Sequence, residues 1–211
     1  MGAAGVLLLI VGVLLFSSTP LLTNVALQLA GAERLGRTAD AFPTDSAART
    51  FSTTGGTALR QTTITLGSYG QVTLPNLTTT ATGASTTLTE ADLLTICGTR
   101  CTRGSDRFRD VSIDLRPGGA VISADVNVGV WQRVGVAVRA SAAGVTVLGV
   151  DAGGVLYDAN TLPAELRDYV REVARVGSEA LQQAVVNIGG VRYTVDELWM
   201  NDTTLTVVFR A

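Results

Sequence analysis

Apolar and polar residues alternate along most of the stretch between residues 108 and 158. In FRDVSIDLR, at 108–116, charged or hydroxyl side chains separate the apolar positions Val111, Ile113 and Leu115. Three further runs, at 120–130, 133–142 and 145–158, repeat the alternation and are separated by short turns rich in glycine. A period of two residues over four neighbouring runs predicts an antiparallel meander with one apolar face.

The spacing of apolar residues lengthens in the stretch at 162–187. Apolar positions recur there every three or four residues, and Pro163 suits the first turn of a helix. The pattern predicts one long amphipathic helix, whose apolar stripe consists of Leu162, Leu166, Tyr169, Val170, Val173, Val176, Ala180, Leu181, Ala184 and Val185.

Shorter elements flank the meander and the long helix. The segment ITLGSYGQVTL, at 64–74, predicts a hairpin that turns at residues 67–70. Thr87 with Glu90, or Thr89 with Asp92, has the spacing of a capping box and predicts a short helix that begins near Glu90. Two last strands, at 191–200 and 203–211, are joined by a tight turn.

The N-terminal segment at 3–32 contains no charged residue. It is long enough for a transmembrane helix, which needs about 20 apolar residues. A cleaved signal peptide, with residues 6–16 as its apolar region, remains an alternative. The predicted organisation is an anchor or signal segment at 1–32, a linker at 33–52 and one extracytoplasmic domain at 53–211.

A sheet with one apolar face needs a cover, and a helix with an apolar stripe can provide it. We therefore predict an α+β fold in which a curved antiparallel sheet wraps around one long amphipathic helix. An N-terminal transmembrane helix precedes this domain in the prediction.

The net charge is −2 at pH 7, and all 16 basic residues are arginine. Without lysine or histidine, the chain lacks the commonest general base, the commonest metal ligand and the Schiff-base nucleophile. The charge balance gives no general attraction to nucleic acid. We therefore expect a non-catalytic protein with no metal and no other cofactor. An enzyme that uses a carboxylate pair such as Glu165 and Asp168 is the alternative, and it needs a cleft that raises one pKa.

The two cysteines, Cys97 and Cys101, are separated by three residues just after the predicted short helix. Two ligands do not complete a zinc site, and thioredoxin-type motifs have two intervening residues. A disulfide is the favoured interpretation, while free thiols or a redox or metal role are the alternatives. A disulfide favours an oxidising compartment, and hence the extracytoplasmic (periplasmic) side.

Four segments together resemble the LmeA-like phospholipid-binding proteins, which belong to the wider TULIP group of lipid-binding domains. They are LTEADL at 88–93, FRDVSIDLRPGGAVISADV at 108–126, LPAEL at 162–166 and VRYTVDELWMNDTTLTVVF at 191–209. The resemblance implies a bacterial, membrane-anchored or exported protein that holds or transfers a phospholipid-type ligand in an apolar tunnel. It implies no covalent chemistry.

Candidate site residues follow from this resemblance and from the apolar pattern. The candidates for the tunnel wall, each of which also suits an ordinary core, are Val111, Ile113, Leu115, Ile122, Val126, Val136, Leu166, Tyr169, Val170 and Val173. Arginines can bind phosphate head groups bidentately, and the candidates are Arg100, Arg103, Arg107 and Arg109. Trp131 and Trp199 lie at predicted strand ends and are candidates for a membrane interface or a tunnel mouth.

The function predicted from these observations is lipid binding by a single-pass protein of the cell membrane, with its domain on the extracytoplasmic side. Its partners would be the membrane and a phospholipid, and no nucleic acid. The alternative is a single-helix accessory subunit of a larger membrane protein complex, whose partners would be the other subunits.

Overall fold

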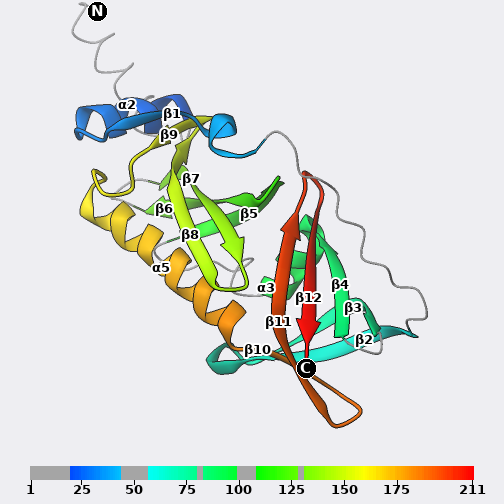
Figure 1. Ribbon diagram of the computed structural model, residues 1–211. Coiled ribbons are helices and arrows are strands. Elements are labelled where there is room, and N and C mark those ends of the chain that lie inside the picture. The colour runs from blue at the N-terminus through cyan, green and yellow to red at the C-terminus, as the bar shows by residue number, and fades with distance from the viewer. Residues whose placement is uncertain (1–19, 44–56, 80–82, 99–107, 128–130) are drawn as a thin grey trace, which may run out of the picture.

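The computed structural model describes residues 20–43, 57–79, 83–98, 108–127 and 131–211 of the 211-residue chain. Within these residues the strands form two sheets, an open sheet and a closed barrel, with three α-helices around them. Figure 1 shows α5 (Ala164–Gln182) running along one side of the open sheet towards the barrel.

The open sheet contains the meander and two short strands. Its antiparallel order is β1 (Arg34–Arg37), β9 (Val155–Tyr157), β8 (Gly144–Ala152), β7 (Trp131–Ser141), β6 (Gly119–Asn127) and β5 (Phe108–Arg116). The predicted meander is confirmed. Its alternation places one apolar face inside, where Ala124, Val134, Val136 and Val150 are almost fully buried. A smaller apolar cluster that includes Phe42 covers part of the opposite face.

The second sheet closes on itself as a six-stranded barrel. Its order is β10 (Ala184–Ile188), β11 (Val191–Met200), β12 (Thr204–Arg210), β4 (Gly83–Thr89), β3 (Gln71–Thr79) and β2 (Thr57–Leu66), and β10 pairs with β2. The predicted β2–β3 hairpin, which turns through the 3₁₀ helix η2 (Gly67–Tyr69), and the β11–β12 pair are confirmed. A barrel of fewer than about eight strands is too narrow to hold more than side chains. Buried apolar residues on its strands include Leu74, Leu77, Leu88, Val207 and Phe209.

The predicted fold class is wrong. It assumed one curved sheet around a helix, whereas the strands form an open sheet and a separate closed barrel. Instead, α5 packs chiefly on β8, where the Ser178 hydroxyl accepts a hydrogen bond from the Val145 amide at 2.9 Å. The helical stretch predicted at 162–187 is also too long, because Ala184–Ile188 pair with both β2 and β11. Alternation indicates which face of a strand is apolar, but it does not indicate which strands pair.

The predicted transmembrane helix and the single-pass membrane location are also wrong. Among the described residues, no helix has the length and apolar character needed to cross a membrane. Residues 1–19 lie outside the described residues, and α2 (Pro20–Leu29) packs on β7 and β8. Leu27 is 2% exposed, and Asn24 bonds through its side chain to the Ala152 carbonyl at 2.6 Å and to the Tyr157 hydroxyl at 2.9 Å. The second part of the uncharged segment therefore belongs to the folded domain, because its polar side chains bond to the open sheet.

Part of the stretch predicted as a linker, at 33–52, lies in the open sheet. Arg34–Arg37 form β1 at the sheet edge, and Thr38–Ala41 form the 3₁₀ helix η1 that leads to Phe42. Residues 44–52 lie outside the described residues.

The short helix predicted near Glu90 is α3 (Glu90–Cys97), which packs on β4 and β5. Of the two proposed capping boxes, the one between Thr89 and Asp92 forms. The Asp92 amide donates to the Thr89 hydroxyl at 3.2 Å, and the Thr89 amide donates to the Asp92 carboxylate at 2.9 Å. The Glu90 carboxylate instead accepts a hydrogen bond from the Leu115 amide at 2.8 Å, which ties α3 to β5.

Replacing Leu27 by alanine tests whether α2 is part of the folded domain. The buried side chain leaves a cavity when it is removed, so Leu27→Ala should lower the free energy of unfolding by about 2–5 kcal/mol. Leu29 is 84% exposed on the same helix. Leu29→Ala should therefore change the free energy of unfolding by no more than about 0.5 kcal/mol. Urea denaturation measures both values, and equal effects would contradict the docked position of α2.

Candidate functional site

The ten residues predicted to line a tunnel all belong to, or pack against, one continuous apolar core. Five of them are buried: Leu115, Val126, Val136, Leu166 and Val170. The other five are only half-buried: Val111, Ile113, Ile122, Tyr169 and Val173. The core therefore contains a closed part and a part that reaches the surface.

The apolar stripe of α5 changes its burial along the helix. Leu166 and Val170, in its first two turns, are buried. One flank of the helix carries a row of apolar residues at spacings of four, three and four: Tyr169, Val173, Val176 and Ala180. All four side chains are only half-buried. This row is apolar surface that is neither sealed in the core nor fully exposed to water.

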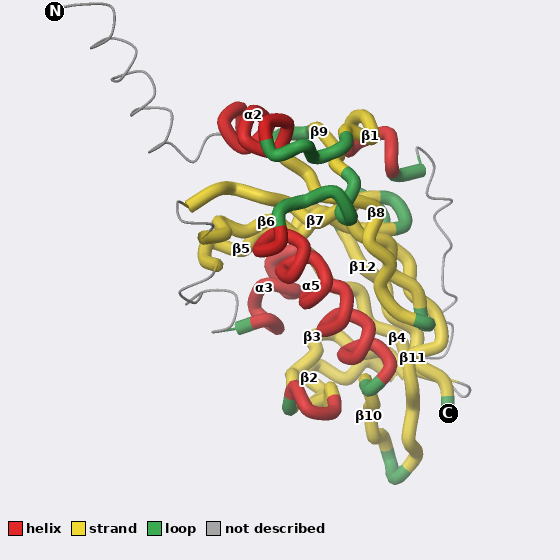
Figure 2. Tube along the Cα trace, turned by 90° about the vertical axis from the view of Figure 1, so that its left-hand side faces the viewer, coloured by secondary structure: helices red, strands yellow, loops and turns green. Residues whose placement is uncertain are grey.

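Half-buried apolar side chains of two strands pack against the same core. Val111 and Ile113 come from β5, and Val195 and Leu198 come from β11, a strand that contacts α5. We call these four residues, together with the row on α5, the seam. Figures 1 and 2 show α5 running from the open sheet to β10, so the seam follows the junction between the two sheets.

An aromatic pair lies where the seam meets the buried part of α5. The ring of Phe108, on β5, and the ring of Tyr169, on α5, have centroids 6.3 Å apart and are tilted by 38°. Burial raises the pKa of Tyr169 to about 12, and the positive charge of Arg133 opposes this shift. The phenol therefore stays protonated at neutral pH and keeps its hydroxyl as a hydrogen-bond donor.

A β-bulge in β5 determines where Phe108 points. The pairing of β5 with β6 is interrupted between Arg109 and Ser112, so that Asp110 and Val111 lie opposite one residue of β6. Asp110 also has a positive φ of 52°, which aspartate tolerates better than most residues. Residues three apart on a regular strand lie on opposite faces, but the extra residue lets Phe108 and Val111 both pack against the core.

Charged side chains on the opposite face of the sheet hold this bulge. Asp125 of β6 lies between two guanidinium groups, with Nε of Arg109 at 3.7 Å and Nη1 of Arg133 at 3.4 Å from its carboxylate oxygens. Arg133 also donates a hydrogen bond to the carbonyl of Asp110, inside the bulge. The guanidinium carbon of Arg109 lies 4.2 Å from the centroid of the Trp131 ring, in a cation–π contact. We call these five residues the bulge cluster.

Arg109 is the predicted head-group residue that the structure describes. Its Nε atom lies 3.5 Å from the Asp110 carboxylate as well as 3.7 Å from that of Asp125. Two arginines and two aspartates balance in the bulge cluster, so the cluster carries no net positive charge. The position of Arg109 is explained by the bulge, and it lends no support to phosphate binding. The other three candidates, Arg100, Arg103 and Arg107, lie outside the described residues.

The remaining candidates are dispersed. Trp199 is half-buried on β11, opposite Thr206 of β12. Cys97 is disulfide-bonded at the end of α3, and the one other cysteine in the sequence, Cys101, lies outside the described residues. Asp168 is 75% exposed and pairs with Arg171 at 3.7 Å, whereas the side chain of Glu165 is not described. In the described ranges, His, Cys, Asp and Glu side chains form no group of three that could hold a metal ion.

The sequence interpretation missed Phe108 and one of the two acidic residues of the bulge cluster, Asp125. A signal for the bulge is present in FRDVSIDLR, because Phe108 is out of phase with the apolar set that begins at Val111. An apolar residue three positions before another apolar residue in a strand indicates one inserted residue. The ion pairs around Asp125 left no comparable pattern, since they join three strands.

No protein-family model, curated protein or solved structure matches this chain. The resemblance to LmeA-like proteins therefore remains a prediction from the quoted motifs. The features that carry a functional inference are the seam, the aromatic pair and the bulge.

Replacing Asp125 by asparagine tests the bulge cluster. The Asp125 side chain is 15% exposed, and its loss of charge leaves two guanidinium groups without their shared carboxylate. Asp125→Asn should lower the free energy of unfolding by about 1–3 kcal/mol. The control is Asp168→Asn, at a 75% exposed ion pair on α5, which should change it by less than about 0.5 kcal/mol. If the two variants unfold at the same urea concentration, the cluster does not stabilise the sheet.

The pKa of Tyr169 predicts a loss of stability at alkaline pH. Its phenol ionises at about pH 10 in an unfolded chain, but at about 12 in the folded protein. The folded state binds the phenolic proton more tightly, so stability falls as the pH rises from about 10 to about 12. Tyr169→Phe should remove this part of the pH dependence. In a pH-jump titration, the tyrosinate absorbance is followed in the unmodified chain and in Tyr169→Phe. The difference between the two curves is the titration of Tyr169, and its midpoint should lie near 12. A midpoint near 10 would refute burial as the cause of the shift.

Proposed function

We propose that this chain is a non-catalytic lipid-binding protein that holds the acyl part of a phospholipid-type ligand along the seam. The observation that carries the proposal is the half-burial of Tyr169, Val173, Val176 and Ala180 as one continuous row on α5. Half-buried apolar residues of β5 and β11 accompany this row.

The energetic argument is the removal of apolar surface from water. Burial is favourable by about 25 cal/mol per Å², so covering about 200 Å² of the seam would contribute about 5 kcal/mol. The seam replaces the predicted tunnel as the proposed site, because five of the ten residues predicted for the tunnel wall are buried in the continuous core.

The choice of a phospholipid-type ligand is supported by the resemblance to LmeA-like proteins at 88–93, 108–126, 162–166 and 191–209. Binding of this kind needs no bond-making step. The side chains of the seam are hydrocarbon apart from the Tyr169 phenol, which stays protonated at neutral pH.

Charge placed in the row tests the proposal. In the full chain, Val176→Glu should reduce the affinity for cis-parinaric acid, a fluorescent fatty acid, at least about tenfold, because a carboxylate would be buried against hydrocarbon. Val191→Glu is the matched control, since Val191 is 44% exposed at the start of β11 and lies outside the seam. Circular dichroism confirms that both variants are folded.

Native mass spectrometry after incubation with phosphatidylglycerol vesicles provides the second measurement. The unmodified chain should carry one lipid, and Val176→Glu should carry much less. A chain that takes up neither probe would contradict lipid binding. That result would favour the alternative, a docking subunit, for which the exposed apolar residues Val25, Leu29 and Leu35 are the available surface.

A further inference from the structure

The two ends of the row on α5 differ in their surroundings. On the N-terminal side of Tyr169, the stripe continues into the buried residues Leu166 and Leu162. On the other side, Val173, Val176 and Ala180 stay half-buried. The stripe of α5 therefore passes into filled core beyond Tyr169, whereas the row remains partly accessible towards Ala180.

The ring of Phe108 reinforces this closed end from the other element. Its centroid lies 6.3 Å from that of Tyr169, and both side chains pack against the shared core. Phe108 comes from β5, which also supplies Val111 and Ile113 to the seam. The pair therefore lies across the line of the seam, with one ring from each wall.

The position of Phe108 is set by the bulge and not by the regular pleat. Without the extra residue at Asp110, the side chain three positions before Val111 would point to the opposite face of the sheet. Asp125 and Arg133 hold the bulge from that opposite face through their ion pair at 3.4 Å and the bond from Arg133 to the Asp110 carbonyl. The fold thus uses an irregular strand and a charged cluster to place one aromatic ring beside α5.

We infer that Phe108 and Tyr169 form the end wall of the lipid site and set the acyl-chain length that it accepts. This inference rests on the proposed function. Eleven positions separate Tyr169 from Ala180, so the row spans about 16 Å at a rise of about 1.5 Å per residue, the length of an extended acyl chain of about a dozen carbons. A longer chain leaves its additional methylenes in water and gains nothing from them.

The test is a chain-length series. Saturated fatty acids from decanoate to icosanoate compete with cis-parinaric acid for the full chain, and the affinity should level off near dodecanoate or tetradecanoate. Phe108→Ala removes the ring and should move this plateau to longer acids. Burial of about two further methylenes should tighten the binding of hexadecanoate about tenfold relative to the unmodified chain.

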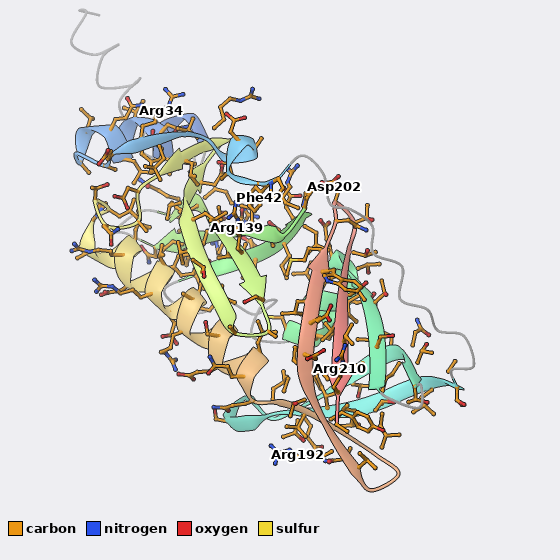
Figure 3. All side chains as sticks on the ribbon, viewed as in Figure 1. Arg34, Phe42, Arg139, Arg192, Asp202 and Arg210 are labelled. Carbon is orange, nitrogen blue, oxygen red and sulfur yellow. The ribbon has the colours of Figure 1, made fainter. Side chains whose placement is uncertain are left out.

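One control separates the end wall from general effects. Phe42→Ala removes a buried ring from the smaller cluster on the other face of the open sheet, where Figure 3 labels it near Arg139. It should leave the plateau where it is.

The outcomes distinguish this inference from the proposed function. If Phe108→Ala binds the acids with the same plateau as the unmodified chain, the inference is overturned and lipid binding stands. If the unmodified chain binds no acid of any length, the proposed function fails and the inference fails with it. Should Phe108→Ala not fold, Phe108→Leu removes the ring with a smaller loss of volume, and an unchanged plateau in that variant overturns the inference equally.

Discussion

The open sheet has an apolar face that it cannot cover by itself, and the arrangement of the other elements follows from that constraint. A barrel closes its own apolar face, but an open sheet needs other elements against it. Here α5 and α2 supply them: Leu166 and Val170 of α5 and Leu27 of α2 are buried in the same core as Val136 and Val150 of the sheet. The core extends from this sheet into the barrel, so the two sheets share one apolar interior. The seam is where that shared interior reaches the surface.

Local patterns in the sequence predicted much of the secondary structure. The alternation in the meander, the hairpin at 67–70 and the Thr89–Asp92 capping box all depend on residues close together in the chain, and each is present. The closure of the barrel was not predictable in this way. It depends on the pairing of Val185 with Thr65, which lie far apart in the chain. Ala184 and Val185 continue the apolar spacing of the helix in the sequence. They lie in a strand because this segment pairs with β2 and β11.

The N-terminal error and the missed role of Asp125 have a common origin. An uncharged segment has the composition of a membrane helix whether or not its polar residues have partners, and Asn24 finds its partners in Ala152 and Tyr157. Asp125 likewise acquires its role from Arg109 and Arg133, which lie on two other strands. The roles of these two side chains depend on tertiary contacts with distant residues, and such contacts leave no periodic pattern in the sequence. The apolar members of the candidate site were predictable as a set, but their division into buried and half-buried residues was not.

The connectivity of the barrel has a consequence for synthesis on the ribosome. Strand β12 joins β4 to β11 in the barrel, so the barrel cannot close until residues 204–210 have been synthesised. Strands β2, β3 and β4 leave the ribosome more than a hundred residues before that point. These strands can pair with one another at that stage, but β2 lacks its partner β10 and β4 lacks its partner β12. Open strand edges invite pairing with other chains. Strands β2, β3 and β4 are rich in threonine, so their surface is more polar than that of strands made of apolar residues. This polarity lowers their tendency to aggregate before β12 is synthesised.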